Sequence, residues 1–309
     1  MKQIVGLVVL LLTTFFTSGQ TLYTKAYGSS KNKPVIFIHG GPGSSSVAFE
    51  ATTAQKLADN GFYVILYDRR GEGLSKDENA KFNFQETFDD LNGIYKKFGI
   101  KKATLIGFSF GGIVSTLYTE KYADNVTSLI LVSSLLSQQE TYSTILKRSK
   151  VIYQTQKDSA NLNNIFKVEN MDKSSFEYRA SCFKHASQNG FFATKNQNDL
   201  AKSLYSKLQS DSGYMKFSSQ KNNDAVVGFW KNEKYSTMSI MPVLKHLQSE
   251  KIKIYALYGK DDGIFSTEQV MNLQDLIGND KLKYLDNCAH YLYTDQQIAF
   301  IAALKTWIK

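Results

Sequence analysis

The sequence predicts an α/β protein with a mostly parallel, doubly wound sheet, interrupted once by a helical cap. Short apolar runs alternate with helical patterns from residue 34 to about 134. Between about 137 and 248 this alternation stops, and Ser, Asn, Gln, Lys and Tyr dominate. The alternation resumes at residue 251. Repeated strand–helix–strand units form parallel sheets with helices on both faces, so the two outer segments are expected to share one sheet.

Six short segments are expected to form the parallel strands of this sheet. They are apolar and rich in β-branched residues, as strands covered on both faces are. These segments are residues 34–39, 62–68, 102–108, 127–133, 251–259 and 281–286. The insertion therefore falls between the fourth and fifth strands.

Three core helices are each expected to open with a capping residue followed three positions later by Glu or Gln. The three pairs are Asn83 and Glu86, Ser266 and Gln269, and Thr294 and Gln297. The first two helices are expected over 83–98 and 266–277. Helical spacing predicts that the last helix buries Ile298, Ile301, Leu304 and Ile308.

The chain is expected to divide into four segments. Within the insertion, residues 141–154 and 200–210 have helical patterns. The segments are a signal peptide (1–19), a first core part (20–136), a helical cap (137–248) and a second core part (249–309).

The N-terminus predicts export. It combines an early Lys, an apolar run over 4–16 and small residues before Gln20. The run is short for a membrane span and has the layout of a cleavable secretory signal. We therefore expect a periplasmic or extracellular protein with no stable membrane insertion after cleavage. An uncleaved N-terminal anchor is the alternative.

Composition limits the partners and cofactors. The net charge of +9 comes from scattered Lys residues rather than a basic stripe, so no nucleic-acid partner is expected. Cys182 and Cys288 lie far apart and are expected to be free thiols. Four dispersed His residues and these two Cys have no metal-ligand spacing, so neither metal nor cofactor is expected. The oligomeric state is left open.

A serine nucleophile is predicted at residue 109. Gly107-x-Ser109-x-Gly111 follows a predicted strand and opens a predicted helix. Small residues on both sides permit the sharp turn that raises a serine oxygen above a sheet, at a helix N-terminus.

The base and the acid follow from chain order, which in such enzymes runs nucleophile, acid, base. Serine needs a base to be nucleophilic. Position eliminates three of the four histidines and leaves His290, just beyond the last strand. Asp262, after the preceding strand, is the expected acid because it would orient the imidazole. Asp261 is the fallback.

The loop "HGGPG" at 39–43 is expected to build half of an oxyanion hole. Acyl transfer needs backbone N–H groups aimed at the developing negative charge. We expect one from Phe110, directly after the serine, and one from Gly41. His39 is expected to support the loop rather than act as a base.

Together these motifs resemble the proline iminopeptidase group of the α/β-hydrolases. The matching stretches are residues 39–43, 67–75 and 107–112, Gly259–Asp262, and His290. The resemblance covers about two thirds of the chain. It implies a cofactor-free Ser–Asp–His hydrolase that releases an N-terminal residue, often proline, from small peptides. Ser109, Asp262 and His290 would be the triad, with Gly41 and Phe110 as the oxyanion hole.

Three features depart from that group, and one of them is Phe110, where the group often has Trp after the serine. Asp-Gln-Arg-Gly is common there, whereas this chain has Asp68-Arg69-Arg70-Gly71. Family peptidases also hold the substrate amine with cap glutamates, and this cap does not align with theirs. Candidates by charge alone are Glu169, Glu177 and Glu233, and an apolar pocket could involve Phe176, Phe183, Phe191 and Phe192. A carboxylesterase or lactonase with the same triad, and a low-turnover ligand-binding protein, are the alternatives.

Overall fold

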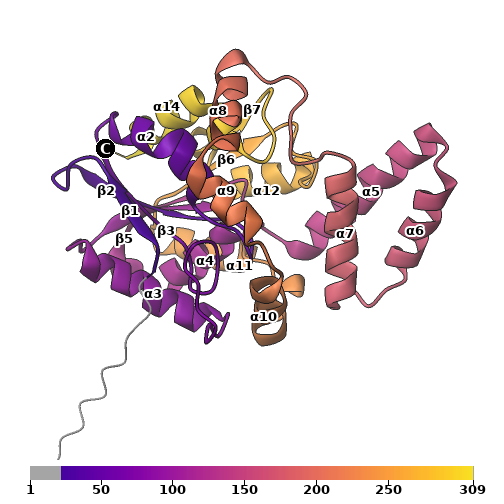
Figure 1. Cartoon of the computed structure of the whole chain (residues 1–309), viewed down its shortest axis with the longest axis horizontal. Helices are drawn as coiled ribbons and strands as arrows, with labels where there is room; N and C mark the ends of the chain where they lie inside the picture. Colours follow the sequence, from indigo (N-terminus) through magenta and orange to yellow (C-terminus); the bar gives the residue numbers. More distant parts are fainter. Residues whose placement is uncertain (1–21, 309) are drawn as a thin grey trace, which may run out of the picture.

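The computed structural model describes residues 22–308, and in this part of the chain seven strands form one sheet (Figure 1). The strands are β1 (Thr24–Tyr27), β2 (Lys33–Ile38), β3 (Phe62–Tyr67), β4 (Ala103–Phe108), β5 (Val126–Val132), β6 (Ile254–Gly259) and β7 (Leu282–Leu285). Their order is β1-β3-β2-β4-β5-β6-β7. Strand β1 pairs antiparallel with β3, and the other pairs are parallel. The six predicted strands and the mostly parallel, doubly wound sheet are confirmed.

Helices cover both faces of the sheet. Successive residues of a strand point to opposite faces, so Ile36 and Ile38 enter one core and Val35 and Phe37 the other. The first core is covered by α3 (Phe84–Lys97), α4 (Phe110–Lys121), α11 (Met241–Ser249) and α12 (Thr267–Ile277). The second is covered by α1 (Val47–Phe49), α2 (Gln55–Ala58), α13 (Leu292–Asp295) and α14 (Gln297–Trp307). A π-helical turn, η1 (Glu50–Ala54), joins α1 to α2.

Further helices lie between β5 and β6. They are α5 (Gln138–Gln156), α6 (Ser159–Glu169), α7 (Phe176–Gln188), α8 (Asp199–Gln209), α9 (Ser212–Ser219) and α10 (Asp224–Glu233). Helices α5 to α7 project away from the sheet and share a small core of their own (Figure 1). The helices expected over 141–154 and 200–210 lie inside α5 and α8. Helix α11 packs on α4 of the sheet layer, and the boundaries of the predicted cap stay a prediction.

Two of the three expected helix caps are formed. Ser266 and Gln269 make the full capping box of α12. Asn83 caps α3 by accepting a hydrogen bond from the Glu86 amide over 2.8 Å. The Glu86 carboxylate instead accepts from the Lys81 amide, so this box is half complete.

The expectation for the last helix was partly wrong. Thr294 and Gln297 form no capping box, because α14 begins at Gln297 itself. The Gln297 side chain donates to the Thr52 carbonyl over 2.7 Å, which ties the helix to η1. Ile298 is 73% exposed, and Phe300 is buried instead. Ile301, Leu304 and Ile308 are buried as expected.

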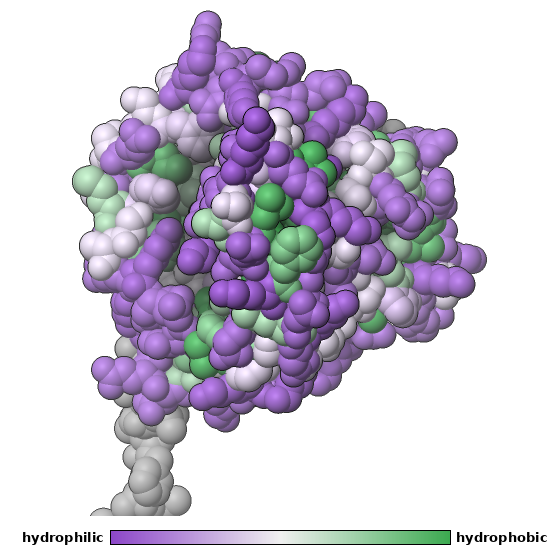
Figure 2. Space-filling model, turned by 90° about the vertical axis from the view of Figure 1, so that its right-hand side faces the viewer, coloured by the Kyte–Doolittle hydropathy of each residue, from purple (hydrophilic) through white to green (hydrophobic). Residues whose placement is uncertain are grey.

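The outer surface is mainly hydrophilic. Viewed toward the projecting helices, apolar side chains form small patches separated by polar ones (Figure 2). Cys182 and Cys288 are free and buried, as expected. Across residues 22–308, no helix combines the length and apolar character that a membrane span requires. The predicted signal peptide lies outside the described residues.

Candidate active site

Ser109 occupies a sharp turn between β4 and α4. Its φ of 53° and ψ of −118° are unusual for a residue with a side chain. A Cβ at Gly107 would collide with the Ser115 hydroxyl, and one at Gly111 with the Ile38 carbonyl oxygen. Glycine is therefore required on both sides of this serine, as the G-x-S-x-G pattern predicts.

The loop after β2 lies against the serine. Strands β2 and β4 are parallel neighbours with Ile38 opposite Gly107, so their carboxyl ends meet at one edge. A Cβ built at Gly40 would lie 3.1 Å from the Cβ of Ser109. Between these strands the chain order along the sheet reverses, where open α/β sheets bind ligands.

Two backbone N–H groups beside the serine are free. Among the described residues, the amides of Gly41 and Phe110 donate no hydrogen bond. Phe110 opens α4, so its amide is one of the helix-terminal donors that lack an intrahelical partner. Both amides are therefore available to an acceptor, and their role as an oxyanion hole stays a prediction.

His290 and Asp262 are hydrogen-bonded. Nδ1 of His290 lies 2.8 Å from Oδ2 of Asp262, and the aspartate is 1% exposed. Oδ1 of Asp262 accepts from the amide of Ile264 over 3.2 Å. Asp261 accepts from the Thr194 hydroxyl instead. The geometry therefore favours Asp262 over the fallback Asp261 as the residue that orients the imidazole.

His290 lies in an aromatic enclosure next to the serine turn. Its ring centre is 5.0 Å from that of Phe108, which precedes Ser109 in the chain, and 5.3 Å from that of Phe192. Ser109 and His290 are 8% and 5% exposed. No hydrogen bond joins the side chains of Ser109 and His290 in the described structure. Proton transfer between this base and this nucleophile is therefore a proposal.

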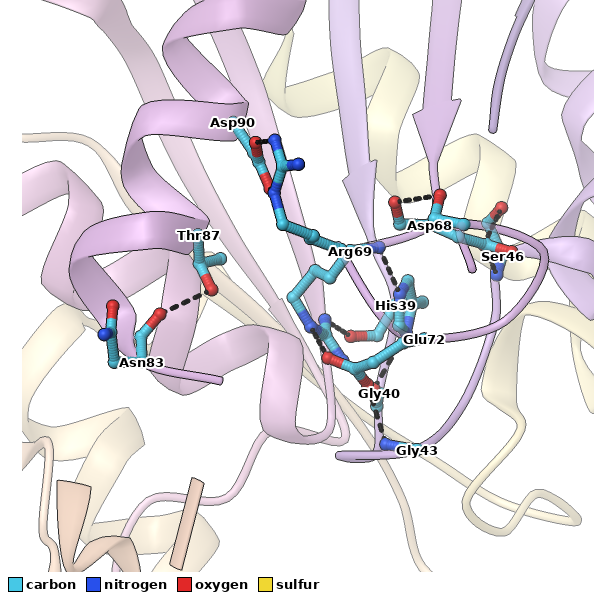
Figure 3. Close-up of polar contacts among 12 residues, drawn as sticks. His39, Gly40, Gly43, Ser46, Asp68, Arg69, Glu72, Asn83, Thr87 and Asp90 are labelled. Atoms are coloured by element: carbon cyan, nitrogen blue, oxygen red, sulfur yellow. Dashed lines mark hydrogen bonds and ion pairs between the residues drawn. The ribbon is translucent and has the colours of Figure 1, made fainter. Parts of the chain in front are cut away.

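Arg69 holds the loop that carries Gly41 (Figure 3). Its guanidinium donates to the carbonyls of His39 and Gly40 over 2.6 and 2.5 Å. It also pairs with Glu72 at 2.7 Å, and Glu72 accepts from the Gly43 amide over 2.7 Å. Both charged residues are buried, so this pair fixes the loop from inside.

His39 supports the same loop and is not available as a base. The Arg69 amide donates to Nε2 over 3.1 Å, so the proton sits on Nδ1, which lies 2.9 Å from the Gly40 carbonyl. Burial, together with the positive charge of Arg69, lowers the pKa of His39 well below 6.5. Both ring nitrogens are occupied, in agreement with the expected supporting role.

Arg69 and Glu72 were not among the site residues predicted from the sequence. Their motif contributed only to the family resemblance, and Arg69 was noted only as a departure from the common Gln. The available signal was a pair of opposite charges three residues apart, directly after a buried strand. Asp68 was not predicted either. Its carboxylate accepts a hydrogen bond from the Ser46 amide over 2.6 Å, which orders the turn that follows the Gly41 loop.

Two of the three candidate glutamates bind other residues of the chain, and the third is exposed. Glu169 pairs with Lys150 at 3.3 Å near the surface. Glu233 accepts from the Phe84 amide over 2.6 Å, at the start of α3. Glu177 is exposed in the first turn of α7. Within residues 22–308, none of these glutamates forms a hydrogen bond or an ion pair with the serine turn.

An apolar cavity of about 180 Å³ lies beside this turn. Its wall includes Ser44, Phe108 and Tyr291, the chain neighbours of Gly43, Ser109 and His290. Helices α8 and α9 close it with Leu208 and Phe217. Of the four candidate phenylalanines, Phe192 contacts His290 and Phe183 stacks on Phe192, whereas Phe191 packs at Gly263 and Phe176 on Trp230.

The described residues offer no metal centre. Within 22–308, no three His, Cys, Asp or Glu side chains gather in a way that could hold an ion. The free groups around Ser109 are backbone donors, an imidazole and aromatic rings. Such a set suits acyl transfer through a serine nucleophile.

The fold and this site define the class of protein. A family model described as the α/β hydrolase fold matches residues 33–296. The chain therefore belongs to the α/β hydrolase family, and it is a hydrolase.

Proteins with similar sequences include proline iminopeptidases. The proline iminopeptidase of Lactobacillus helveticus is 23% identical over 302 residues, which is 95% of each chain. That of Clostridioides difficile is 25% identical over 281 residues, or 89% of each chain.

Solved structures show the same fold. A proline iminopeptidase-related protein from Thermus thermophilus superposes with a TM-score of 0.65 at 17% identity, covering 93% of this chain and 94% of that one. An esterase from Exiguobacterium antarcticum superposes with a TM-score of 0.63 at 18% identity, covering 93% and 95%.

Proposed function

We propose that the protein is a serine hydrolase in which Ser109, His290 and Asp262 form the triad. The observation that carries this proposal is the buried 2.8 Å contact between His290 and Asp262, next to the strained serine turn. The free amides of Gly41 and Phe110 supply the oxyanion hole. Each such donor contributes about 3 kcal/mol to transition-state stabilisation.

The reaction runs through an acyl-enzyme. Nε2 of His290 takes the hydroxyl proton as the oxygen of Ser109 bonds to the substrate carbonyl carbon. The imidazolium then gives this proton to the leaving amine or alcohol, and the carbon–nitrogen or carbon–oxygen bond breaks. Water, deprotonated by His290, attacks the acyl carbon and releases the acid together with Ser109.

The preferred substrate class is a small peptide that loses its N-terminal residue. Support comes from the full-length similarity to curated proline iminopeptidases. The "HGGPG" form of the loop is also typical of that group.

A carboxylesterase or lactonase is the second candidate, and one observation favours it. None of the three cap glutamates reaches the serine turn, so the described residues offer none of these carboxylates to a substrate amine. The cavity beside the serine is lined mainly by apolar and aromatic side chains, which suits an acyl chain.

A substrate panel on the mature protein tests the proposal. Prolyl and alanyl anilides are compared with short-chain esters, with Ser109→Ala as the control. Hydrolysis of anilides that requires a free amine supports the aminopeptidase, and better turnover of esters supports the second candidate. A folded wild type that neither turns over substrate nor reacts with a fluorophosphonate at Ser109 would instead be a ligand-binding protein.

We also propose that the protein is exported. The N-terminal signal pattern supports this, and mass determination of the protein from periplasm and medium tests it. A mature chain beginning near Gln20 in either fraction agrees with export. A full-length chain in the membrane fraction indicates the uncleaved anchor.

A further inference from the structure

A second polar cluster lies between the inserted helices and the sheet. Tyr142 on α5, Arg179 on α7 and Tyr235 in the turn η3 (Tyr235–Thr237) each keep a buried polar atom without a partner among the described residues. These atoms are the two phenol oxygens and Nε of Arg179. A buried polar group without a partner costs about 1–3 kcal/mol. Three together call for a missing partner.

Arg179 lies against both Tyr235 and Phe183, and Tyr142 packs on the same Phe183. The Arg179 guanidinium carbon lies 5.4 Å from the ring centre of Tyr235 and 4.9 Å from that of Phe183. Burial raises the pKa of both Tyr142 and Tyr235, and the positive charge of Arg179 opposes this rise. Both phenols therefore keep their protons and can donate hydrogen bonds.

The charge of Arg179 is not neutralised within the described structure. No carboxylate of residues 22–308 lies within ion-pair distance of it. Glu72, whose charge acts on Tyr235, is already bound to Arg69 and the Gly43 amide. The guanidinium offers only donors, and each phenol can donate as well, so a carboxylate that accepts from all three is the ligand that matches this set.

This cluster adjoins both halves of the candidate active site. The Tyr235 ring packs on that of Phe110, an oxyanion-hole residue, at 5.3 Å. Phe183, beneath Arg179, stacks on Phe192 at 6.4 Å, and Phe192 packs on His290 at 5.3 Å. Tyr235 therefore contacts both Arg179 and Phe110, and Phe183 and Phe192 connect Arg179 to the base.

We propose that Arg179, Tyr142 and Tyr235 bind a carboxylate of the substrate, so that the enzyme selects short substrates with a free carboxylate near the scissile bond. This inference rests on the proposed function, because it takes the carbonyl at Ser109 as the reacting group. Arg179 supplies the positive charge and a planar pair of N–H donors, and the two phenols donate further hydrogen bonds to the carboxylate.

Matched substrates test the preference. The kcat/KM of a short peptide or ester with a free carboxylate is compared with that of its carboxamide. Wild type should favour the carboxylate at least about tenfold, the size expected of a charged hydrogen bond. Arg179→Met should abolish most of this ratio through KM, and Arg179→Lys should restore part of it. Tyr142→Phe and Tyr235→Phe should each reduce the ratio.

Lys184→Met is the matched control, because it removes a positive charge from an exposed position on the same helix. The ratio in this variant should equal that of wild type. A wild type that treats carboxylate and carboxamide alike overturns the inference while hydrolysis stands. Retention of the full ratio by a folded Arg179→Met protein overturns it as well.

Calorimetry separates this inference from the proposed function. A short peptide carboxylate is titrated into the Ser109→Ala protein with and without Arg179→Met. Binding that disappears with Arg179 supports the carboxylate site even when the wild type hydrolyses nothing and resists fluorophosphonate. Equal binding by both proteins, or binding by neither, overturns it.

Discussion

The guanidinium of Arg69 donates a 2.6 Å hydrogen bond to the carbonyl of His39, at the point where β2 becomes the loop next to Ser109. A second bond reaches the Gly40 carbonyl, and Glu72 completes the buried pair. The position of the Gly41 amide therefore depends on a charge that follows the neighbouring strand β3. This contact links the stability of the core to the proposed oxyanion hole.

Replacing Arg69 by the Gln that is common in the resembling group should impair both stability and catalysis. Arg69→Gln leaves Glu72 buried without its partner, which should lower the free energy of unfolding by about 3 kcal/mol. The looser loop should reduce kcat by about tenfold, a fraction of the loss expected when one oxyanion donor is removed. Urea unfolding and steady-state kinetics measure the two effects.

The double variant Arg69→Gln with Glu72→Gln is the control. It removes both charges, so it should recover much of the stability lost in the single variant. A double variant that is less stable than Arg69→Gln would show that the ion pair is not the source of the effect.

Asp262→Asn should lower kcat by about 10³-fold or more, because an amide cannot hold the imidazole in the tautomer with a proton on Nδ1. Asp261→Asn should change kcat little, since Asp261 accepts from Thr194 instead. Both proteins should fold, as checked by circular dichroism. A larger kcat loss in Asp261→Asn than in Asp262→Asn would reverse the assignment of the acid.

The core could be predicted because its signals are local. Buried parallel strands are apolar runs, and the serine turn needs glycines at fixed positions, so both are visible in the sequence. Strand β1 was missed because TKAY, residues 24–27, is a short, half-exposed edge strand without an apolar run. Ile298 was misplaced because it lies in the first turn of α14, and helical spacing does not show how far the packed face of a helix extends.

The rest of the site depends on contacts between distant segments. Arg179 gives no pattern in the sequence, because its neighbours Tyr142 and Tyr235 lie in other elements. Among the inserted helices only those around 141–154 and 200–210 were predicted from the sequence, although α7 is longer than α8. The role of Glu72 likewise cannot be seen in the sequence, because it depends on a contact with the Gly43 amide that forms only in the folded protein.

His39 should make stability depend on pH. Its pKa in the folded protein is well below 6.5, so below about pH 6.5 the unfolded chain binds a proton that the folded chain does not. Wild type should therefore lose stability relative to His39→Gln as pH falls, by up to about 1.4 kcal/mol per pH unit. Above about pH 6.5 the difference in the free energy of unfolding between wild type and His39→Gln should be constant.

Urea unfolding of both proteins between pH 8 and about pH 5.5 measures this difference. His185, whose pKa burial also lowers, is present in both and cancels. A difference that stays constant across the whole range would mean that His39 carries a proton in the fold.

The apolar cavity should control which acyl or side-chain group the enzyme accepts. Leu208 on α8 is 7% exposed and lines the cavity, so Leu208→Trp should fill part of its space. We expect KM to rise about tenfold for substrates with large apolar groups, equivalent to the loss of about two buried methylenes, and less for acetyl-sized groups. Steady-state kinetics on an ester series of increasing chain length measures this.

Leu200→Trp adds the same side chain at a position of α8 that is 37% exposed, and it should leave the chain-length profile unchanged. Because both variants carry the same new indole on one helix, a difference between them reports the cavity rather than added bulk. Equal profiles for Leu208→Trp and wild type, in proteins of equal melting temperature, would place the substrate elsewhere.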